Sequence, residues 1–295
     1  MLAVIAANGQ IGRQIARQLS SRATPVRAIV RRADAFLAEL PHVKMVVGDA
    51  EDVPFLTRAL EGTEAVFTLT PPSYAAPSHS VAVDRFGSAV LAAIVASGVS
   101  KVVNLSSAGA SLPDGTGPIA GLYRNEQRLN SLADVDVLHL RAASFMENLL
   151  AKVVPMRQFG VFPDMMDPDV AFPMVASADI AAAAVAALMR RDFRGKSALE
   201  VLGPRDYTMR EAGSVLASAI GRPEIPVVRA DPAETKAVLA AHGFSNDFAA
   251  KFAEMADALS SRRIQATVVR TAANTTTTSL EAWAPIFVAA YAQTA

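Results

Sequence analysis

The sequence predicts a doubly wound α/β domain with a parallel sheet, followed by a smaller helix-rich lobe. In the first half of the chain, short runs of Val, Ile, Leu and Ala alternate with amphipathic helical stretches, at a period of about 25 residues. The runs are apolar almost throughout, which is typical of strands buried on both faces of a parallel sheet. After about residue 150 the alternation stops and prolines become frequent. We therefore expect a Rossmann domain over residues 1–152 and a C-terminal substrate lobe over residues 153–295.

Six strands are expected, with a helix after each of the first five. The strands are predicted at Leu2–Ala6, Val26–Val30, Val43–Val47, Ala65–Leu69, Val102–Leu105 and Val135–Leu140. The helices are predicted at Ile11–Leu19, Ala33–Leu40, Val53–Leu60, Val81–Ser97 and Gly121–Leu132. Since parallel strands share one carboxyl edge, the loops that follow them should meet there and form the binding site.

The second part is predicted to be mostly helical, with parts of 175–205 packing back on the Rossmann sheet. A capping box, in which Thr208 and Glu211 satisfy each other's backbone, opens a helix that runs to Ile220. Thr275–Thr278 is expected to form a surface loop. The other predicted elements are a helix at Ser177–Met189 with Ser177 as N-cap, a strand at Ala198–Leu202, a helix from Asp231-Pro232 and a helix at Ser245–Leu259.

The composition excludes several classes of function. The 295 residues carry 28 Lys+Arg and 28 Asp+Glu, so a basic nucleic-acid footprint is not expected, nor is binding to an anionic membrane. The longest apolar run, Ile180–Met189, is shorter than the roughly 18 residues of a bilayer span. There are 0 cysteines, and the 4 histidines show no metal-ligand spacing, so we expect no thiolate and no metal chemistry. The N-terminus reads as a strand and not as a signal peptide, so a cytoplasmic protein is expected.

A small-residue turn follows the first strand. Ala6 begins a stretch that continues Ala7, Asn8, Gly9, Gln10, Ile11, Gly12 and then opens a helix. Dinucleotide folds need small residues here, because the backbone turns sharply and approaches the pyrophosphate at the positive end of a helix. Gly9 and Gly12 match the last two glycines of G-x-x-G-x-x-G, and Ala6 stands where the first would be. An ordinary strand-to-helix turn is the alternative reading.

The end of the second strand indicates which dinucleotide is bound. NAD enzymes place an acidic residue about 20 residues past the turn to bind the ribose 2′-hydroxyl, whereas an arginine suits the 2′-phosphate of NADP. This chain has Arg31 and Arg32 there. Guanidinium groups can bind phosphate oxygens in a bidentate manner. NADP(H) is therefore the predicted cofactor, with a solvated basic strand end as the alternative.

Four more loops leave the predicted carboxyl edge. Asp49 and Ala50 are expected beside the adenine, unless Asp49 or Asp52 only caps the next helix. Thr70, Pro71 and Pro72 form a rigid loop suited to a cofactor wall. The last two loops should flank the nicotinamide, through Ser106 and Ser107 in one and Phe145 in the other.

With these residues assembled, the chain resembles the NmrA-like family of atypical short-chain dehydrogenase/reductases. The resemblance rests on the stretches Asn8–Gly12, Val30–Arg32, Val47–Asp49, Thr70–Pro72, Leu105–Gly109, Phe145–Leu149 and Leu202–Thr208. It implies a Rossmann domain with a small C-terminal lobe, NADP(H) held by the first loop and Arg31, and a substrate cleft between the lobes. The family includes NAD(P)H-dependent quinone and azo reductases, and regulators that bind the dinucleotide without turning it over.

The sequence departs from the active short-chain dehydrogenase pattern at one position. Those enzymes pair a serine with Tyr-x-x-x-Lys, in which the lysine binds the ribose and activates the tyrosine. Here Ser107 and Tyr123 are the candidate catalytic residues, but Gln127 stands where the lysine would be. Ketone or alcohol chemistry needs that proton donor, whereas an electron-poor acceptor can take a hydride directly and collect its proton from water.

The leading hypothesis is thus an NADPH-dependent reductase of a hydrophobic conjugated acceptor, quinone-like or azo-like. The alternative is a regulatory protein that senses NADP(H) without catalysis. Whether the alanine-rich helices also pack against a second subunit, as in a homodimer, is left open. The C-terminal stretches 163–173 and 233–259 are expected to form a lid. Candidate pocket walls are Phe145, Met146, Tyr123, Tyr74, Phe162, Phe172 and Met174.

Overall fold

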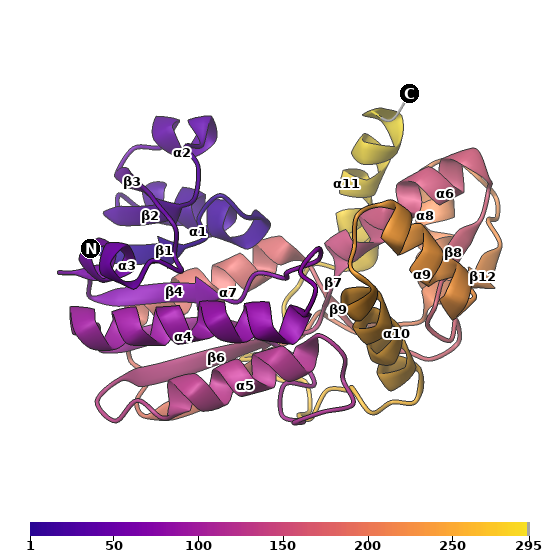
Figure 1. Cartoon of the computed structure of the whole chain (residues 1–295). Helices are drawn as coiled ribbons and strands as arrows, with labels where there is room; N and C mark the ends of the chain where they lie inside the picture. Colours follow the sequence, from indigo (N-terminus) through magenta and orange to yellow (C-terminus); the bar gives the residue numbers. More distant parts are fainter. Residues whose placement is uncertain (294–295) are drawn as a thin grey trace.

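The computed structural model describes residues 1–293 of the chain. Over that range, seven parallel strands form one sheet in the order β10-β6-β5-β4-β1-β2-β3 (Figure 1). The order reverses between β1 and β4, which is where doubly wound sheets open a crevice for ligands. The predicted Rossmann-type fold is confirmed. The strands are β1 (Leu2–Ile5), β2 (Val26–Val30), β3 (Val43–Val47), β4 (Ala65–Leu69), β5 (Lys101–Ser107), β6 (Asp136–Ala142) and β10 (Lys196–Val201).

Helices cover both faces of this sheet, because its strands are apolar on both sides. Along β1, Leu2 and Val4 pack under α1 and α7, whereas Ala3 and Ile5 pack under α3, α4 and α5. The helices around the sheet are α1 (Gln10–Ser20), α2 (Ala35–Glu39), α3 (Val53–Leu60), α4 (His79–Ser97), α5 (Ile119–Asn130) and α7 (Ser177–Arg190).

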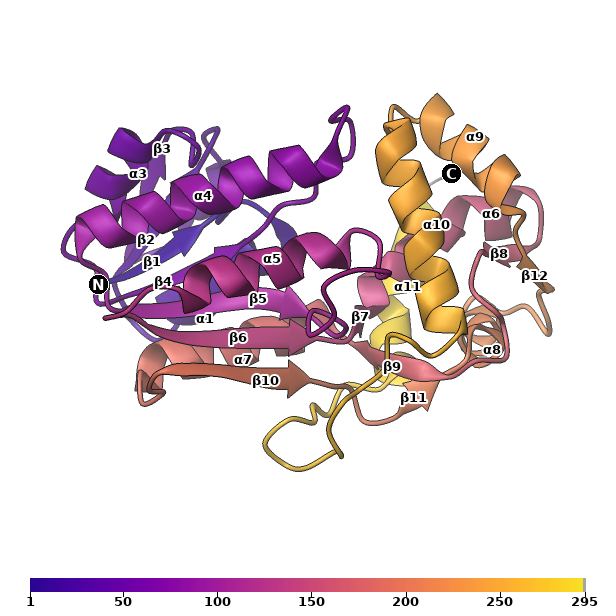
Figure 2. The same ribbon diagram turned by 60° about the horizontal axis from the view of Figure 1, so that its bottom comes forward.

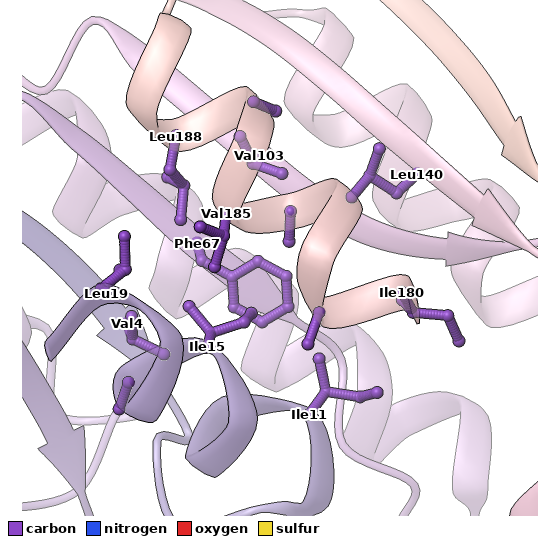
Figure 3. Packing of buried hydrophobic residues seen from close by; sticks show 14 of the residues in the cluster. Val4, Ile11, Ile15, Leu19, Phe67, Val103, Leu140, Ile180, Val185 and Leu188 are labelled. Carbon is purple, nitrogen blue, oxygen red and sulfur yellow. The ribbon is translucent and has the colours of Figure 1, made fainter. Parts of the chain in front are cut away.

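The core beneath α1 and α7 fixes the start of α1 against the sheet. Figure 3 shows the ring of Phe67, from β4, surrounded by Ile11 and Ile15 of α1 and Val185 of α7. All four side chains are buried, so each contributes roughly 1.5–3 kcal/mol of burial free energy. Close packing of this kind leaves the first turn of α1 no freedom to shift toward or away from the crevice.

The segment 175–205 belongs largely with the first sheet. Helix α7 packs on α1, and β10 extends the sheet beyond β6. The N-cap prediction for α7 is wrong by one residue, since Ala176 caps the helix and Ser177 is its first residue. The Ser177 hydroxyl donates instead to Glu147, at 2.6 Å, so it cannot serve the helix backbone.

The rest of the chain forms a second lobe beside the carboxyl edge of the sheet (Figure 2). A three-stranded sheet, in the order β11-β9-β7, begins it, and strands β12 and β8 pair in parallel. The predicted capping box of α8 is confirmed, with both Thr208 and Glu211 engaged. The elements are β7 (Ser144–Phe145), a 3-10 helix η1 (Met146–Lys152), α6 (Val153–Gln158), β8 (Phe162–Asp164), β9 (Phe172–Val175), β11 (Asp206–Tyr207), α8 (Met209–Ala219), β12 (Val227–Arg229), α9 (Pro232–Ala241), α10 (Asn246–Ser260) and α11 (Leu280–Gln293).

Helix α11 and the segment before it were not predicted as they stand. Leu280, Trp283 and Phe287 of α11 are buried in the core of the second lobe. The threonine stretch is not a plain surface loop, because Thr276 N donates to Leu202 O at 2.7 Å and ties it to the end of β10. The apolar spacing of α11, together with Ser279 before it, is the helix signal that the sequence carries.

Helix α4 is long and apolar enough to cross a membrane by length and composition alone. It lies along the sheet between α3 and α5, and Val90 and Ile94 are buried there. A core helix of this kind meets the same length and composition test, so the feature is weak evidence for a membrane span.

Candidate functional site

A cavity of about 830 Å³ lies at the carboxyl edge of the sheet, between the two lobes. It is lined by the loops that follow β1, β2, β3, β4, β5 and β6, and by β9 and α10. Ligand sites of 300–1,000 Å³ at the switch point of an open α/β sheet are the rule for this architecture. The structure brings most of the predicted site residues to this cavity, namely Asn8, Gly9, Gln10, Ile11, Arg31, Asp49, Ala50, Thr70, Pro71, Pro72, Ser106, Ser107 and Phe145.

The turn after β1 is built for a close backbone approach. Ala6 adopts a left-handed conformation, with φ of 55°, at the position where the motif has its first glycine. Gly9 N donates to Ala6 O at 2.9 Å and closes the turn. A Cβ on Gly12 would lie 2.5 Å from Ala6 O and 2.7 Å from Ala7 Cα, so only glycine fits there. Gly12 therefore serves the packing of helix on strand and does not line the cavity.

The N-terminus of α1 faces the cavity, since Gly9, Gln10 and Ile11 line it. Gly9 is the N-cap and gives no side-chain cap, and the first turn has no acidic residue. The first backbone N–H groups of the helix thus have no side-chain acceptor, and the helix dipole adds partial positive charge. This arrangement suits the pyrophosphate of a dinucleotide.

The two arginines after β2 differ in position. Arg31 lines the cavity, and within residues 1–293 it has no ion-pair partner, so its guanidinium is available to a ligand. Arg32 is exposed and does not line the cavity. Arg13 is not available either, because it forms an ion pair with Asp34 that lowers the pKa of that carboxyl. Of the two arginines predicted to bind the 2′-phosphate, only Arg31 therefore lines the cavity.

The two aspartates of the loop after β3 have different roles, one in the structure of α3 and one in the cavity wall. Asp52 caps α3 by accepting from Phe55 N at 3.1 Å, as one alternative reading held. Asp49 accepts from Glu51 N at 2.9 Å and lines the cavity. Arg85, from α4, forms an ion pair with Glu51 and also lines the cavity. Sequence reasoning missed Arg85, since nothing local marks which face of α4 meets the loop after β3.

A hydroxyl on the next loop lacks a partner. The Thr70 Oγ1 atom is buried and forms no hydrogen bond within residues 1–293, although it belongs to a cavity-lining residue. An unpaired buried hydroxyl costs about 1–3 kcal/mol, so a ligand that pairs with it gains that much. Together with the glycine cradle and the free Arg31, this atom shows that the residues fit a bound dinucleotide.

The two serines after β5 have different roles. Ser106 Oγ donates to Glu126 Oε1 at 2.5 Å, and Arg141 holds the same buried carboxylate, so this hydroxyl points away from the cavity. Ser107 Oγ donates to Ala108 O at 2.9 Å and belongs to the cavity wall. Ser106 thus contributes backbone and Cβ atoms, whereas Ser107 has a hydroxyl within the site.

Tyr123 does not line the cavity, which departs from its predicted role. The residues of α5 that do are Ile119 and Leu122, which are three positions apart and share one face of the helix. Tyr123 is one residue further on, about 100° around the helix axis, and so is directed elsewhere. Neither tyrosine nor lysine of a catalytic triad is therefore present at the cavity on α5.

The far end of the cavity is apolar. Phe145 and Phe172, both predicted walls, line it together with Pro173, and α10 adds Met255 and Leu259. Three other candidates, Met146, Phe162 and Met174, are core residues of the second lobe. Asn148, in the loop expected to flank the nicotinamide, also lines the cavity. Sequence reasoning missed Ile264 and Gln265, because the segment that carries them has no recognisable pattern.

Glu147 holds this end of the site together. Its carboxylate accepts hydrogen bonds from Ser177 N at 3.0 Å and from Trp283 Nε1 at 3.1 Å, and Gln14 of α1 donates to Ser177 Oγ at 2.7 Å. The negative charge also lies at the N-terminus of α7, where the helix dipole favours it. Glu147 thereby joins α1, α7, η1 and α11 directly beside two cavity-lining residues, Phe145 and Asn148.

Helix α10 is anchored on both sides of the cavity. On one side, the Tyr74 ring packs 4.9 Å from the Phe248 ring between centroids, and Ser245 N donates to Tyr74 O at 2.8 Å. Burial raises the pKa of the Tyr74 phenol, which therefore stays protonated. On the other side, Gly117, with φ of 60°, lies so close to Lys251 O that a Cβ would clash with it. The α10 wall is thus held in place over the cavity.

Among residues 1–293, no group of His, Cys, Asp or Glu side chains is arranged to hold a metal ion. The chemistry of the site is that of a glycine turn, a helix N-terminus, one free arginine and an apolar chamber. Residues 6–144 match the model of a family described as NAD(P)H-binding.

Two characterised proteins are similar along most of the chain. A (4-alkanoyl-5-oxo-2,5-dihydrofuran-3-yl)methyl phosphate reductase from Streptomyces griseus is 32% identical over 223 residues, covering 76% of this chain and 75% of that protein. An NAD(P)H azoreductase from Xenophilus azovorans is 28% identical over 224 residues, with the same coverage of both chains.

Solved structures share the fold over nearly the whole chain. An NADPH-dependent quinone oxidoreductase from Escherichia coli, complexed with NADPH, matches with a TM-score of 0.80 and 22% identity, covering 97% of this chain and 99% of that one. NmrA, a negative transcriptional regulator in complex with NAD, matches with a TM-score of 0.66 and 15% identity, covering 89% and 82%. The resemblance noted from the sequence is confirmed at the level of the fold.

Proposed function

Because the chain belongs to the NAD(P)H-binding family, we propose that it is an NADPH-dependent oxidoreductase that reduces a small, hydrophobic, conjugated acceptor. One observation carries the proposal. The cavity does not end at the dinucleotide cradle but continues into an apolar chamber walled by Phe145, Phe172 and Met255. A protein that only senses the dinucleotide has no need of such a chamber.

Different loops at the cavity would hold different parts of the cofactor. The N–H groups at the start of α1 bind the pyrophosphate, and Arg31 pairs with the 2′-phosphate. Asp49, Ala50 and Arg85 would lie beside the adenosine, and Thr70 would offer a hydroxyl to the cofactor. Pro71 and Pro72 keep that loop extended, so little ordering entropy is lost on binding.

NADPH supplies a hydride, which together with one proton from water reduces the acceptor by two electrons. Since Tyr123 lies off the cavity and Gln127 replaces lysine, the residues of α5 provide no proton relay. The chamber's part is to orient a flat acceptor and to exclude water around it. Ser107 and Asn148 offer it neutral hydrogen-bonding groups. Quinone-type and azo-type acceptors need no positioned acid, so they suit a chamber that has no proton relay.

The test is steady-state oxidation of NADPH, followed at 340 nm, with a panel of quinones and azo compounds. The proposal predicts turnover with at least one of them, and little change in rate for Tyr123→Phe. Tight NADPH binding without turnover on any acceptor would contradict it and favour a regulatory protein. A loss of more than a hundredfold in Tyr123→Phe would restore Tyr123 as the proton donor.

A further inference from the structure

The charged residues of the cavity are confined to one end. They come from the loops after β2 and β3 and from α4, which surround the proposed adenosine site, and they are Arg31, Asp49, Glu51 and Arg85. Beyond them, the lining residues between Leu105 and Gln265 include no charged side chain. The polar groups of this second part are neutral hydroxyls and amides, among them Ser107, Ser144, Asn148 and Gln265.

Three ionic residues that are neighbours of lining residues lie outside the cavity lining. Arg263, adjacent to the wall residue Ile264, donates to Gly115 O at 2.9 Å. Lys251, on α10 one turn before Met255, does not line the cavity. Glu147, whose carboxylate accepts hydrogen bonds from Ser177 and Trp283, does not line the cavity either, and its negative charge cannot pair with an anion. An anion in the chamber would therefore find no counter-ion among the lining residues.

The walls of the chamber also offer an ion poor solvation. Ile119 and Leu122 from α5, Met255 and Leu259 from α10, and Ile264 are all apolar. When a sulfonate, carboxylate or phosphate moves from water into this chamber, it loses hydration, and no ion pair offsets the free-energy cost of that loss. A flat, uncharged ring system loses no such hydration and gains from the burial of its apolar surface.

We infer that the acceptor is an uncharged conjugated molecule and that the chamber discriminates against anionic acceptors of the same shape. This rests on the proposed function, since it takes the chamber as the acceptor site. The inference separates this chain from the Streptomyces griseus relative, which is named for a phosphate-bearing substrate. It also predicts poor reduction of sulfonated azo dyes and quinones.

The test compares matched pairs that differ by one sulfonate. For turnover, 1,2-naphthoquinone is compared with its 4-sulfonate, whose electron-withdrawing group would by reactivity alone favour the charged compound. For binding, calorimetry on the NADP⁺-loaded protein compares naphthalene-2-methanol with naphthalene-2-sulfonate, neither of which can be reduced under these conditions. We expect kcat/KM and affinity to favour the neutral partner by at least about a hundredfold.

A positive charge placed in the chamber should reduce the preference for the neutral compound over its sulfonated partner. Met255→Lys adds an ammonium group to the chamber wall. The ratio of kcat/KM for the neutral quinone to kcat/KM for its sulfonate is then expected to fall to within about tenfold. Val238→Lys is the control, because it adds the same charge on α9 at an exposed position that does not line the cavity. It should leave the ratio of the wild-type protein unchanged.

The outcomes distinguish this inference from the proposed function. Equal turnover of both quinones by the wild-type protein overturns the inference and leaves the reductase intact. If no acceptor of the panel is reduced, these two quinones included, the proposed function fails, and the binding pair still decides the inference. Tighter binding of the alcohol then supports an uncharged ligand, and equal or tighter binding of the sulfonate overturns it.

Discussion

Replacing Ala6 by glycine should stabilise the protein, although most alanine-to-glycine changes do the opposite. The left-handed conformation of Ala6 costs roughly 1–2 kcal/mol for a residue with a Cβ, and glycine does not incur that cost. Glycine also loses more backbone entropy on folding than alanine does, and this offsets about 0.5–1 kcal/mol of the gain in stability. The net gain is about 0.5–1 kcal/mol, or a rise of about 2 °C in Tm for a domain of this size.

The assay is thermal unfolding of Ala6→Gly beside Ala23→Gly. Ala23 has a similar φ, of 52°, in the exposed turn after α1 and is not a cavity residue, so it should gain the same stability. NADPH affinity should be unchanged in Ala23→Gly and unchanged or tighter in Ala6→Gly, because the lost methyl group lies beside the pyrophosphate site. If Ala6→Gly lowers Tm while Ala23→Gly raises it, the proposed strain in the turn after β1 is refuted.

Three further predictions concern the packing around the site. Glu147→Ala should lower the free energy of unfolding in urea by about 1–3 kcal/mol, since Ser177 N and Trp283 Nε1 lose their acceptor, and Glu147→Gln should lose less. Equal losses would show that the hydrogen bonds are not the cause. Gly117→Ala should lower Tm more than Gly115→Ala, because both have positive φ but only Gly117 faces the Lys251 carbonyl; the reverse order would contradict the docking of α10. Burial lowers the pKa of His139 below its ordinary 6.5, so the unfolded chain binds this proton at a higher pH than the folded protein does. The contribution of His139 to the free energy of unfolding is therefore complete above pH 6.5 and declines as the pH falls below that value. Urea unfolding at pH 7 and pH 5 should show a smaller decline in His139→Gln, and an identical decline would remove His139 as a source.

The sheet and its loops could be predicted because their signals are local. Each strand of the first half is a short apolar run followed by a helix, and parallel strands share one carboxyl edge, so Asn8, Asp49, Thr70 and Ser107 arrive at that edge. The left-handed conformation of Ala6 is likewise implied by its place in the glycine motif.

The remaining site residues depend on tertiary packing that no local pattern reports. The face of α5 that meets the cavity is set by how the helix seats on the sheet, which brings in Leu122 and leaves Tyr123 out. Arg31 and Arg32 are adjacent in the sequence, and the course of the chain after β2 decides that Arg31 lines the cavity and Arg32 does not. Ile264 reaches the chamber through an irregular segment whose course depends on the packing of α10 against the loop after β5.

The central claim, that this cavity binds NADPH through Arg31, is tested most directly by the dissociation constants of NADPH and NADH for three proteins. Wild type should prefer NADPH. Arg31→Ala should weaken NADPH binding by about 10- to 100-fold, the loss of a charge-assisted contact, with NADH affinity changed by less than about threefold. Arg32→Ala, an adjacent arginine outside the cavity, should change neither constant. Unaltered NADPH affinity in Arg31→Ala, or an equal loss for NADPH and NADH, would contradict the account.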